Sequence, residues 1–232
     1  MFCDQLNHKR TQQFKQWLGN KSVIVVGNSI HLMNGAYGKL VDSYDVVVRL
    51  GKGIVDPTLY ACLGTKTHVW FSGMFRAHLH HKVQCKWKIL TISSRSVFEN
   101  DNGFVAINKV LLDNNFQPYR DYFWADSIPD TAQHWSSLGF NKDVRPSQGL
   151  VCCDFLTRKV EHTNIHILGF DFFTHNMEFD GKKYTSWHLP EKAGAVQELA
   201  HDTELEKNTM QKLIRDYGIV HLPYYNWQKL EW

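Results

Sequence analysis

Short hydrophobic runs recur along the chain and predict the strands of a sheet. They cover Val23–Val26, Asp45–Leu50, His68–Phe71, Lys88–Ser93, Tyr122–Trp124, Asn164–Phe170 and Ile219–Leu222. The second run is nearly continuous in valine, which is typical of a strand that is covered on both faces, as in a parallel sheet. The pattern therefore favours a parallel sheet over an antiparallel one.

Between these runs, apolar residues recur at helical spacing. We predict helices over residues 10–18, 31–42, 104–114, 146–159 and 203–217. In the last of them Met210, Leu213, Ile214 and Tyr217 share one face. Strands that alternate with helices predict an α/β fold with a doubly wound, mostly parallel, Rossmann-like sheet, in which ligands bind outside the carboxyl ends of the strands.

Length and composition predict one domain. The 232 residues contain no repeat and no Pro/Gly linker, so we expect a helical extension over 1–20, a core over 21–223 and an aromatic tail over 224–232. A net charge of +3 without a Lys/Arg stripe argues against nucleic acid as a partner. Five cysteines without a C-x-x-C pair indicate reduced thiols and a cytoplasmic protein. No run approaches the roughly 18 apolar residues of a spanning helix.

The turn Gly27-Asn28-Ser29 follows the first strand. Backbone N–H groups at such a turn favour an anion, and the Asn28 amide could bond a phosphate or a base edge. The spacing is neither G-x-G-x-x-G nor that of a P-loop. The alternative is a turn that uses Gly and Asn only for their conformational tolerance.

A second segment, Arg145-Pro146-Ser147-Gln148-Gly149, opens a predicted helix. Ser147 and the first N–H groups would face a ligand, and Gly149 would let that ligand approach the backbone. The alternative is an ordinary helix start with Pro and Ser in their usual places.

A third segment places His201 just before a helix. Thr203 and Glu206 fit a capping box, with Thr203 as N-cap. The helix dipole would then keep the His201 ring neutral and able to accept a proton, although a structural histidine is the alternative. Three histidines within residues 78–81 lack a partner at zinc-finger spacing, so we expect a solvated loop there and no metal site.

Taken in order, these segments resemble the eukaryotic-type sialyltransferase family. Its large motif is matched by VIVVGNSIHL, YDVVVRL and LGTKTHVWF, its small motif by RPSQGLVCCDFL followed by HILGFDFF, and its very small motif by His201 and Glu206. The resemblance covers roughly residues 20 to 222. Three short motifs in the family order are fairly specific.

The resemblance implies metal-independent, inverting transfer from a CMP-activated sugar on a variant type A glycosyltransferase fold. The absence of D-x-D from the chain agrees with metal independence, and we expect no cofactor. His201 would be the general base, supported by Glu206. The nucleotide and donor would be bound by Gly27, Asn28, Ser29, Arg145, Ser147, Gln148, Gly149 and Gly169.

The chain departs from the family pattern at several places. Gly51 stands where the family has Asn, Gln148 replaces Thr, and the cysteines that pair the large and small motifs are missing. The leaving phosphate would be contacted by His188 or Tyr184, neither of which aligns cleanly, or by Lys66. These departures indicate a bacterial or viral relative.

Two donors and two kinds of function stay open. CMP activates both sialic acid and Kdo, and Kdo would imply lipopolysaccharide or capsule synthesis. The acceptor would be a glycan or glycolipid, and the aromatic residues 224–232 are either core cover or a peripheral membrane contact at the inner membrane. The alternative to an enzyme is a degenerate relative that binds CMP without catalysis.

Overall fold

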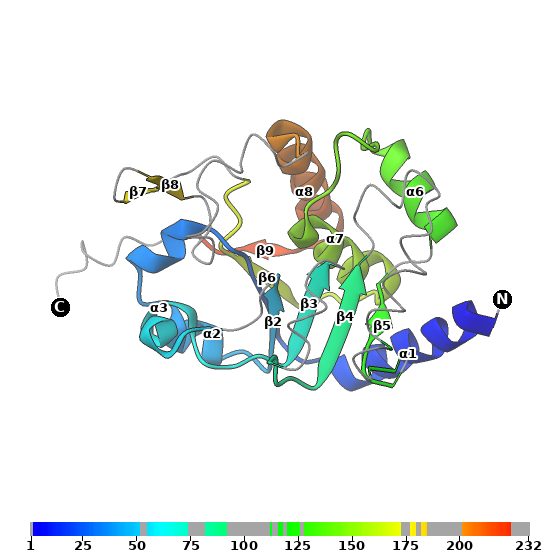
Figure 1. Cartoon of the computed structure of the whole chain (residues 1–232), viewed down its shortest axis with the longest axis horizontal. Coiled ribbons are helices and arrows are strands. Elements are labelled where there is room, and N and C mark those ends of the chain that lie inside the picture. Colours follow the sequence, from blue (N-terminus) through cyan, green and yellow to red (C-terminus); the bar gives the residue numbers. More distant parts are fainter. Residues whose placement is uncertain are drawn as a thin grey trace.

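A computed structural model describes residues 2–51, 55–73, 82–91, 112, 116–117, 120–125, 128–172, 177–179, 182–184 and 201–223. Seven strands form one parallel sheet in the order β5-β4-β3-β2-β1-β6-β9 (Figure 1). They are β1 (Val23–Val26), β2 (Val46–Leu50), β3 (Val69–Gly73), β4 (Trp87–Thr91), β5 (Phe123–Trp124), β6 (Ile165–Leu168) and β9 (Val220–His221). The expected doubly wound α/β fold is confirmed.

Alternate side chains of the central strands bury against two layers of helices. Val23 and Val25 belong to a core that includes α1 (Phe2–Leu18), α7 (Gln148–Asp154) and α8 (Thr203–Tyr217). Ile24 and Val26 belong to a second core with η1 (Ile30–Asn34), α2 (Gly38–Asp42) and α3 (Tyr60–Leu63), which follows η2 (Pro57–Leu59). Figure 1 shows α7 and α8 on one side of the sheet, and α2 and α3 on the other. Burial on both faces explains the continuous valine runs.

Three predicted helices have different bounds. The helix expected over 31–42 is two short pieces, η1 and α2, because the chain leaves η1 at Gly35, against which the Tyr37 ring packs too closely for any side chain. The helix expected over 146–159 begins at Gln148 and ends as a π-helix, η4 (Phe155–Lys159). The first helix begins at Phe2, well before residue 10.

Some elements lack a matching prediction. The helix α6 (Ile128–Ser137) and the antiparallel hairpin of β7 (Met177–Phe179) and β8 (Lys182–Tyr184) were not predicted. The predicted helix over 104–114 lies outside the described residues, apart from Leu112. Tyr217, which was expected on the buried face of α8, is 41% exposed because it lies in the last turn of the helix.

A side chain of α1 forms hydrogen bonds to the edge strand β5, at one end of the sheet. The Asn7 amide donates to the carbonyl of Trp124 over 2.8 Å and accepts from the Trp124 N–H over 2.9 Å. Further along α1, the buried Phe14 ring packs on Trp87 and Phe123. The N-terminal helix is therefore packed into the same core as the sheet.

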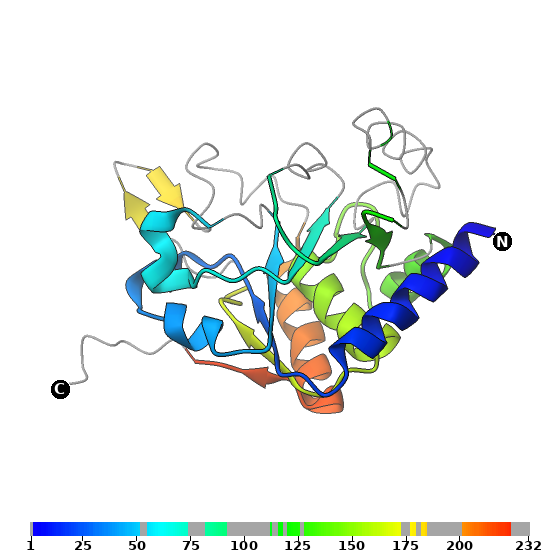
Figure 2. The same cartoon turned by 90° about the horizontal axis from the view of Figure 1, so that it is seen from below.

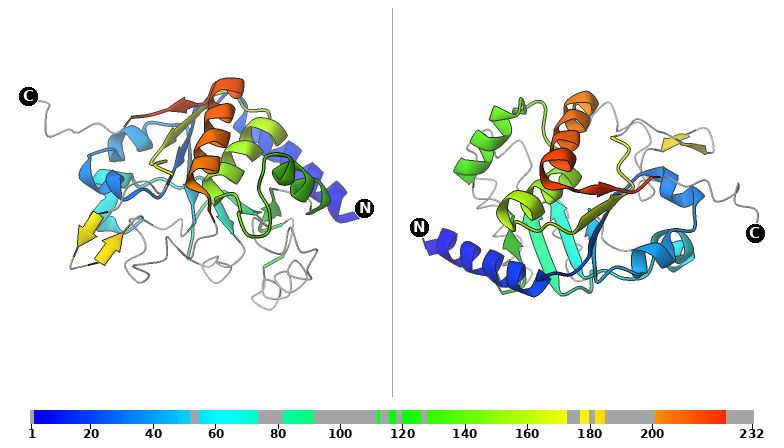
Figure 3. Two further views of the ribbon diagram at one scale, coloured as in Figure 1. Left: turned by 90° about the horizontal axis from the view of Figure 1, so that it is seen from above. Right: turned by 180° about the vertical axis from the view of Figure 1, so that it is seen from behind.

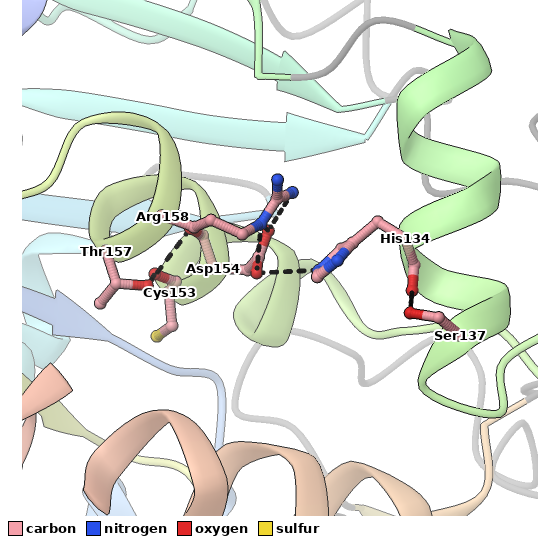
Figure 4. Close-up of polar contacts among 6 residues, drawn as sticks. All are labelled: His134, Ser137, Cys153, Asp154, Thr157 and Arg158. Atoms are coloured by element: carbon pink, nitrogen blue, oxygen red, sulfur yellow. Dashed lines mark hydrogen bonds and ion pairs between the residues drawn. The ribbon is translucent and has the colours of Figure 1, made fainter. Parts of the chain in front are cut away.

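The end of α7 carries the buried carboxylate of Asp154, which lies between the partly exposed His134 and Arg158 (Figure 4). The Asp154 carboxylate accepts from His134 Nε2 on α6 over 3.0 Å and from both Nε and Nη2 of Arg158. This cluster joins α6 to α7.

The fold brings several turns and helix starts to one edge of the sheet. The carboxyl ends of the strands point to the side of the molecule on which the β7–β8 hairpin lies (Figures 2 and 3). Because α7 and α8 precede the parallel strands β6 and β9, both helices begin at this edge. The candidate site is built here.

Candidate active site

The strand order reverses at β1, which lies between β2 and β6. The turns after β1 and β6 touch: the Gly27 N–H donates to Leu168 O over 2.7 Å and the Ser29 N–H to Gly169 O over 3.2 Å. A Cβ on Gly27 would lie 2.2 Å from Gly169 O, and Gly169 has φ +80°. Both glycines are therefore required by the backbone packing at the switch point, where open α/β sheets bind ligands.

Asn28 and Ser29 differ in what they can offer a ligand. Asn28 Oδ1 is buried and has no hydrogen-bond partner within the described part of the chain, a state that costs about 1–3 kcal/mol until a donor arrives. The Ser29 hydroxyl is already engaged, because it donates to Asp171 Oδ2 over 2.7 Å and accepts from the His31 N–H. Asn28 is thus the better placed of the two for a ligand.

The start of α7 packs directly on these turns. A Cβ on Gly149 would lie 2.6 Å from the Phe170 ring, and the same ring would meet a Cβ on Gly27 at 3.0 Å. The close approach that Gly149 permits is therefore made by Phe170. The Gln148 amide lies against Gly73 at the carboxyl end of β3.

Ser147 connects α7 to α8. As the N-cap of α7 it accepts from the Leu150 N–H, and its own N–H and hydroxyl both donate to the carboxylate of Glu206, the hydroxyl over 2.9 Å. The predicted capping box is wrong. Asp202, not Thr203, is the N-cap of α8, because its carboxylate reaches two N–H groups of the first turn. Glu206 is thereby left to bind Ser147.

His201 lies beside this pair. Its Nδ1 is 2.7 Å from Arg145 O and 3.8 Å from Glu206 Oε1. Because a carbonyl only accepts, Nδ1 carries the proton and Nε2 carries the lone pair. Burial lowers the pKa of His201 below 6.5, and the positive charge of Arg145 lowers it further, against the bond to the Arg145 carbonyl. The ring is therefore neutral at pH 7.

Glu206 is a buried carboxyl without a cationic partner in direct contact among the described residues. Burial raises its pKa to about 7, the two bonds from Ser147 lower it in part, and the charge of Asp202 raises it again. The structure thus brings two hydrogen-bonded pairs, His201 with Arg145 and Ser147 with Glu206, next to each other, and so places the second and third segments together.

Two other predicted contacts are placed differently. Gly51, at the end of β2, has φ +67°, and its carbonyl accepts from Trp70 Nε1 over 2.7 Å and from the Ser72 hydroxyl over 3.2 Å. Lys66 precedes β3 and bonds Asp42 O, so it lies at the amino edge of the sheet. It cannot contact a phosphate at the carboxyl edge, and that expectation was wrong.

Other expectations fall partly outside the described residues. His188 and the histidines of 78–81 lie there, and only the backbone of Tyr184 is described, in β8. Within the described part, no group of three or more His, Cys, Asp or Glu side chains could hold a metal, and no helix is long and apolar enough to span a membrane. The four described cysteine side chains, Cys62, Cys85, Cys152 and Cys153, are free thiols.

Phe170 and Asp171 were missed as parts of the site. Both follow β6 directly, and an acidic residue at that place is a signal that the sequence carries. Its partner Ser29 is 142 positions away and follows β1, a strand whose adjacency to β6 the sequence does not reveal. The bond could therefore be found only once the strand order was known.

The sequence profile of Glycosyltransferase family 29 (sialyltransferase) matches residues 3–217. A mammalian sialyltransferase solved with Gal-beta-1-3GalNAc-ortho-nitrophenol is 16% identical, with a TM-score of 0.57 over 93% of this chain and 78% of that one. The apo alpha-2,3-sialyltransferase of Campylobacter jejuni is 16% identical, with a TM-score of 0.54 over 88% and 76%. No curated protein matches the chain significantly by sequence. At these identities the structural likeness shows the fold.

Proposed function

The chain belongs to glycosyltransferase family 29, the sialyltransferases, and from this premise we propose that it is an active, inverting, metal-independent transferase. It would move a 3-deoxy-2-ulosonic acid, sialic acid or Kdo, from its CMP-activated donor to a hydroxyl of a glycan or glycolipid. The observation that supports this most directly is the bond from His201 Nδ1 to Arg145 O, because it leaves Nε2 as a neutral base at the carboxyl edge of the sheet.

In the proposed reaction, His201 Nε2 takes the proton of the acceptor hydroxyl. The acceptor oxygen forms its bond to the anomeric carbon while the bond from that carbon to the phosphate oxygen breaks, and CMP leaves with the electron pair. Glu206 supports the base indirectly, since it fixes Ser147 and lies 3.8 Å from the His201 ring. Positioning and proton removal would supply most of the acceleration, because CMP is already a good leaving group.

The nucleotide would bind at the switch point. Asn28 Oδ1, which has no hydrogen-bond partner among the described residues, would accept from an N–H or O–H of the cytidine, next to the touching turns of Gly27 and Gly169. Ser29 would not contact the nucleotide through its hydroxyl, which is already bonded to Asp171, and would support the turn that carries Asn28. Gly51 has no side chain to contact the nucleotide, and its carbonyl already accepts from Trp70 and Ser72.

The anionic part of the donor would lie over the start of α7. Arg145 brings a positive charge close to His201, and its Nε is buried without a hydrogen-bond partner among the described residues. Gln148 and the N–H groups near Gly149 would hold the donor carboxylate, with Ser147 shaping the turn. Either sugar carries this carboxylate, so both donors remain in the proposal.

The departing phosphate would be met by His188 or Tyr184, without a metal. We expect transfer to survive an excess of EDTA, since a divalent cation has no role in this scheme. Loss of transfer in EDTA that Mg²⁺ or Mn²⁺ restores would contradict metal independence while leaving the donor assignment intact.

A donor screen tests the proposed function. CMP-sialic acid and CMP-Kdo are each incubated with the protein and a galactoside acceptor, chosen because the mammalian relative was solved with a Gal-beta-1-3GalNAc compound, and CMP release is measured. One donor should be consumed in an acceptor-dependent way. CMP binding by calorimetry without release from either donor, with or without acceptor, would favour the alternative, a degenerate CMP-binding module.

A further inference from the structure

We propose that Asp171 is a positioning residue for donor binding, which acts by holding Ser29 so that Asn28 is presented to the nucleotide. This inference rests on the proposed function, and it assigns a role to a carboxylate that does not itself contact the donor. It is carried by the buried hydrogen bonds between the turns after β1 and β6.

Hydrogen bonds tie these two turns together, and three of them are made between described residues. Two of them, from Gly27 to Leu168 and from Ser29 to Gly169, join backbone groups, so they do not depend on the identity of the Ser29 side chain. The third runs from the Ser29 hydroxyl to Asp171 Oδ2, 2.7 Å away, and depends on both side chains. Ser29 is 3% and Asp171 9% exposed, so water competes little for this bond.

Ser29 has almost no capacity left for a ligand. Its hydroxyl proton goes to Asp171, its oxygen accepts from the His31 N–H as the N-cap of η1, and its own N–H is bonded to Gly169. Ser29 is therefore a structural junction, and Asp171 determines which way its hydroxyl points.

Asn28 lies between two anchored residues. With Gly27 and Ser29 both bonded to the turn after β6, the backbone of Asn28 is fixed, and its buried Oδ1 is set in place before any ligand arrives. Preorganised polar groups bind more tightly because less freedom is lost on binding. Removal of the Asp171 carboxylate should thus weaken nucleotide binding although Asp171 makes no contact with the nucleotide.

The experiment compares Asp171→Ala, Asp171→Asn, Ser29→Ala and the Ser29→Ala/Asp171→Ala double variant. CMP affinity is measured by calorimetry, and donor KM and kcat by CMP release. We expect Asp171→Ala to raise the CMP Kd and the donor KM about tenfold, equivalent to about 1.4 kcal/mol, with kcat changed far less. Asp171→Asn should restore much of the affinity, because its amide oxygen still accepts from Ser29.

The double variant should weaken CMP binding by less than the sum of the two single effects, since both single variants lose the same Ser29–Asp171 bond, and Ser29→Ala loses in addition the bond from the His31 N–H. A matched control exists at the opposite edge of the sheet, where Asp45 accepts from the N–H and hydroxyl of Ser22 over 2.8 Å. Asp45→Ala removes a serine–aspartate contact that is exposed to solvent, between the segments that lead into β1 and β2, and should leave the CMP Kd unchanged.

Three outcomes would contradict the inference. Unchanged CMP affinity in Asp171→Ala would overturn it alone, as would additive effects of the two single substitutions. If Asp171→Ala lowers both kcat and the melting temperature but leaves the donor KM unchanged, the role of Asp171 is purely structural. If the unaltered protein fails to bind CMP, the proposed function is overturned and the inference with it.

Discussion

Two buried carboxylates, Asp154 and Glu206, are equally buried, but their pKa values are shifted in opposite directions. Each side chain is 2% exposed and each lies next to a histidine, at 3.0 Å for His134 and 3.8 Å for His201. Burial would raise the pKa of Asp154, but the bonds from His134 and Arg158 and the charge of Arg158 outweigh it and lower that pKa. Burial raises the pKa of Glu206 to about 7.

The partner decides the difference. Asp154 is surrounded by cationic or hydrogen-donating side chains at the end of α7, whereas Glu206 is bonded by the neutral Ser147 at the start of the same helix. A buried carboxylate whose charge is balanced by a cation stabilises a scaffold over a wide pH range. A buried carboxylate that lacks a cation and has a pKa near 7 is typical of sites that move protons or bind charge.

The largest effect is expected at the site histidine. His201→Ala should lower the transfer rate by about 10²–10⁴-fold, because the acceptor proton loses its base, while CMP still binds. His134→Ala is the matched control in the scaffold: it should lower stability by about 1 kcal/mol and leave turnover per folded molecule unchanged. Transfer assays and calorimetry measure both, and near-normal turnover of His201→Ala would refute the base assignment.

The scaffold carboxylate should give the largest loss of stability. Asp154→Ala removes the carboxylate that accepts from His134 and Arg158 and should lower the free energy of unfolding by about 2–3 kcal/mol, measured by urea denaturation. Asp216 bonds Arg215 on the surface, where the two side chains are 39% and 73% exposed. Asp216→Ala should therefore change stability by less than about 0.5 kcal/mol. Equal losses in the two variants would show that the buried cluster adds nothing.

The two carboxylates should also differ in the sign of their pH dependence. Folding raises the Glu206 pKa from 4.5 to about 7, so the folded protein binds more protons in this window and its free energy of unfolding falls as the pH rises through it, by about 3 kcal/mol in full. Glu206→Gln should remove this fall. The lowered Asp154 pKa has the opposite effect: its contribution is complete above pH 3.8 and is lost as the pH drops through the folded value.

Urea denaturation of the unaltered protein and of Glu206→Gln at pH 5 and pH 8 separates these cases, because the Asp154 contribution is constant across that interval. The difference in stability between the two proteins should change with pH in the stated direction. A constant difference would mean that Glu206 titrates near its ordinary pKa.

The smallest effect is expected from Asp202→Asn. Asparagine caps a helix about as well as aspartate, but the substitution removes a charge that raises the Glu206 pKa. The Glu206 midpoint should fall by less than about one unit, as followed by carbon NMR of its carboxyl group. Asp216→Asn, near the other end of α8, should not move it. An upward shift in Asp202→Asn would contradict the assigned cause.

The sheet was predictable because its signals are local. Valine-rich runs such as Val46–Leu50 are buried on both faces wherever the sheet is parallel, and the alternation of strands and helices set the fold class. Boundaries were harder where the signal depends on packing: the break between η1 and α2 follows from the Tyr37 ring against Gly35, which no periodicity reveals.

The candidate site was only partly predictable. The three segments could be found because each is a short motif at an element boundary, but the roles within them depend on contacts across the fold. The sequence analysis assigned the N-cap of α8 to Thr203, and the geometry shows that the carboxylate of Asp202 caps the helix instead. The bond from Ser147 to Glu206, 59 positions away, likewise follows from the pairing of α7 with α8.

The amide of Asn7 has a consequence for the behaviour of the protein in solution. The outermost strand of an open sheet presents unpaired peptide groups, onto which a strand from another molecule can add. At Trp124 both groups are already occupied by a side chain that imitates a peptide unit. A single residue of the N-terminal helix thus protects this margin of the sheet from intermolecular strand pairing.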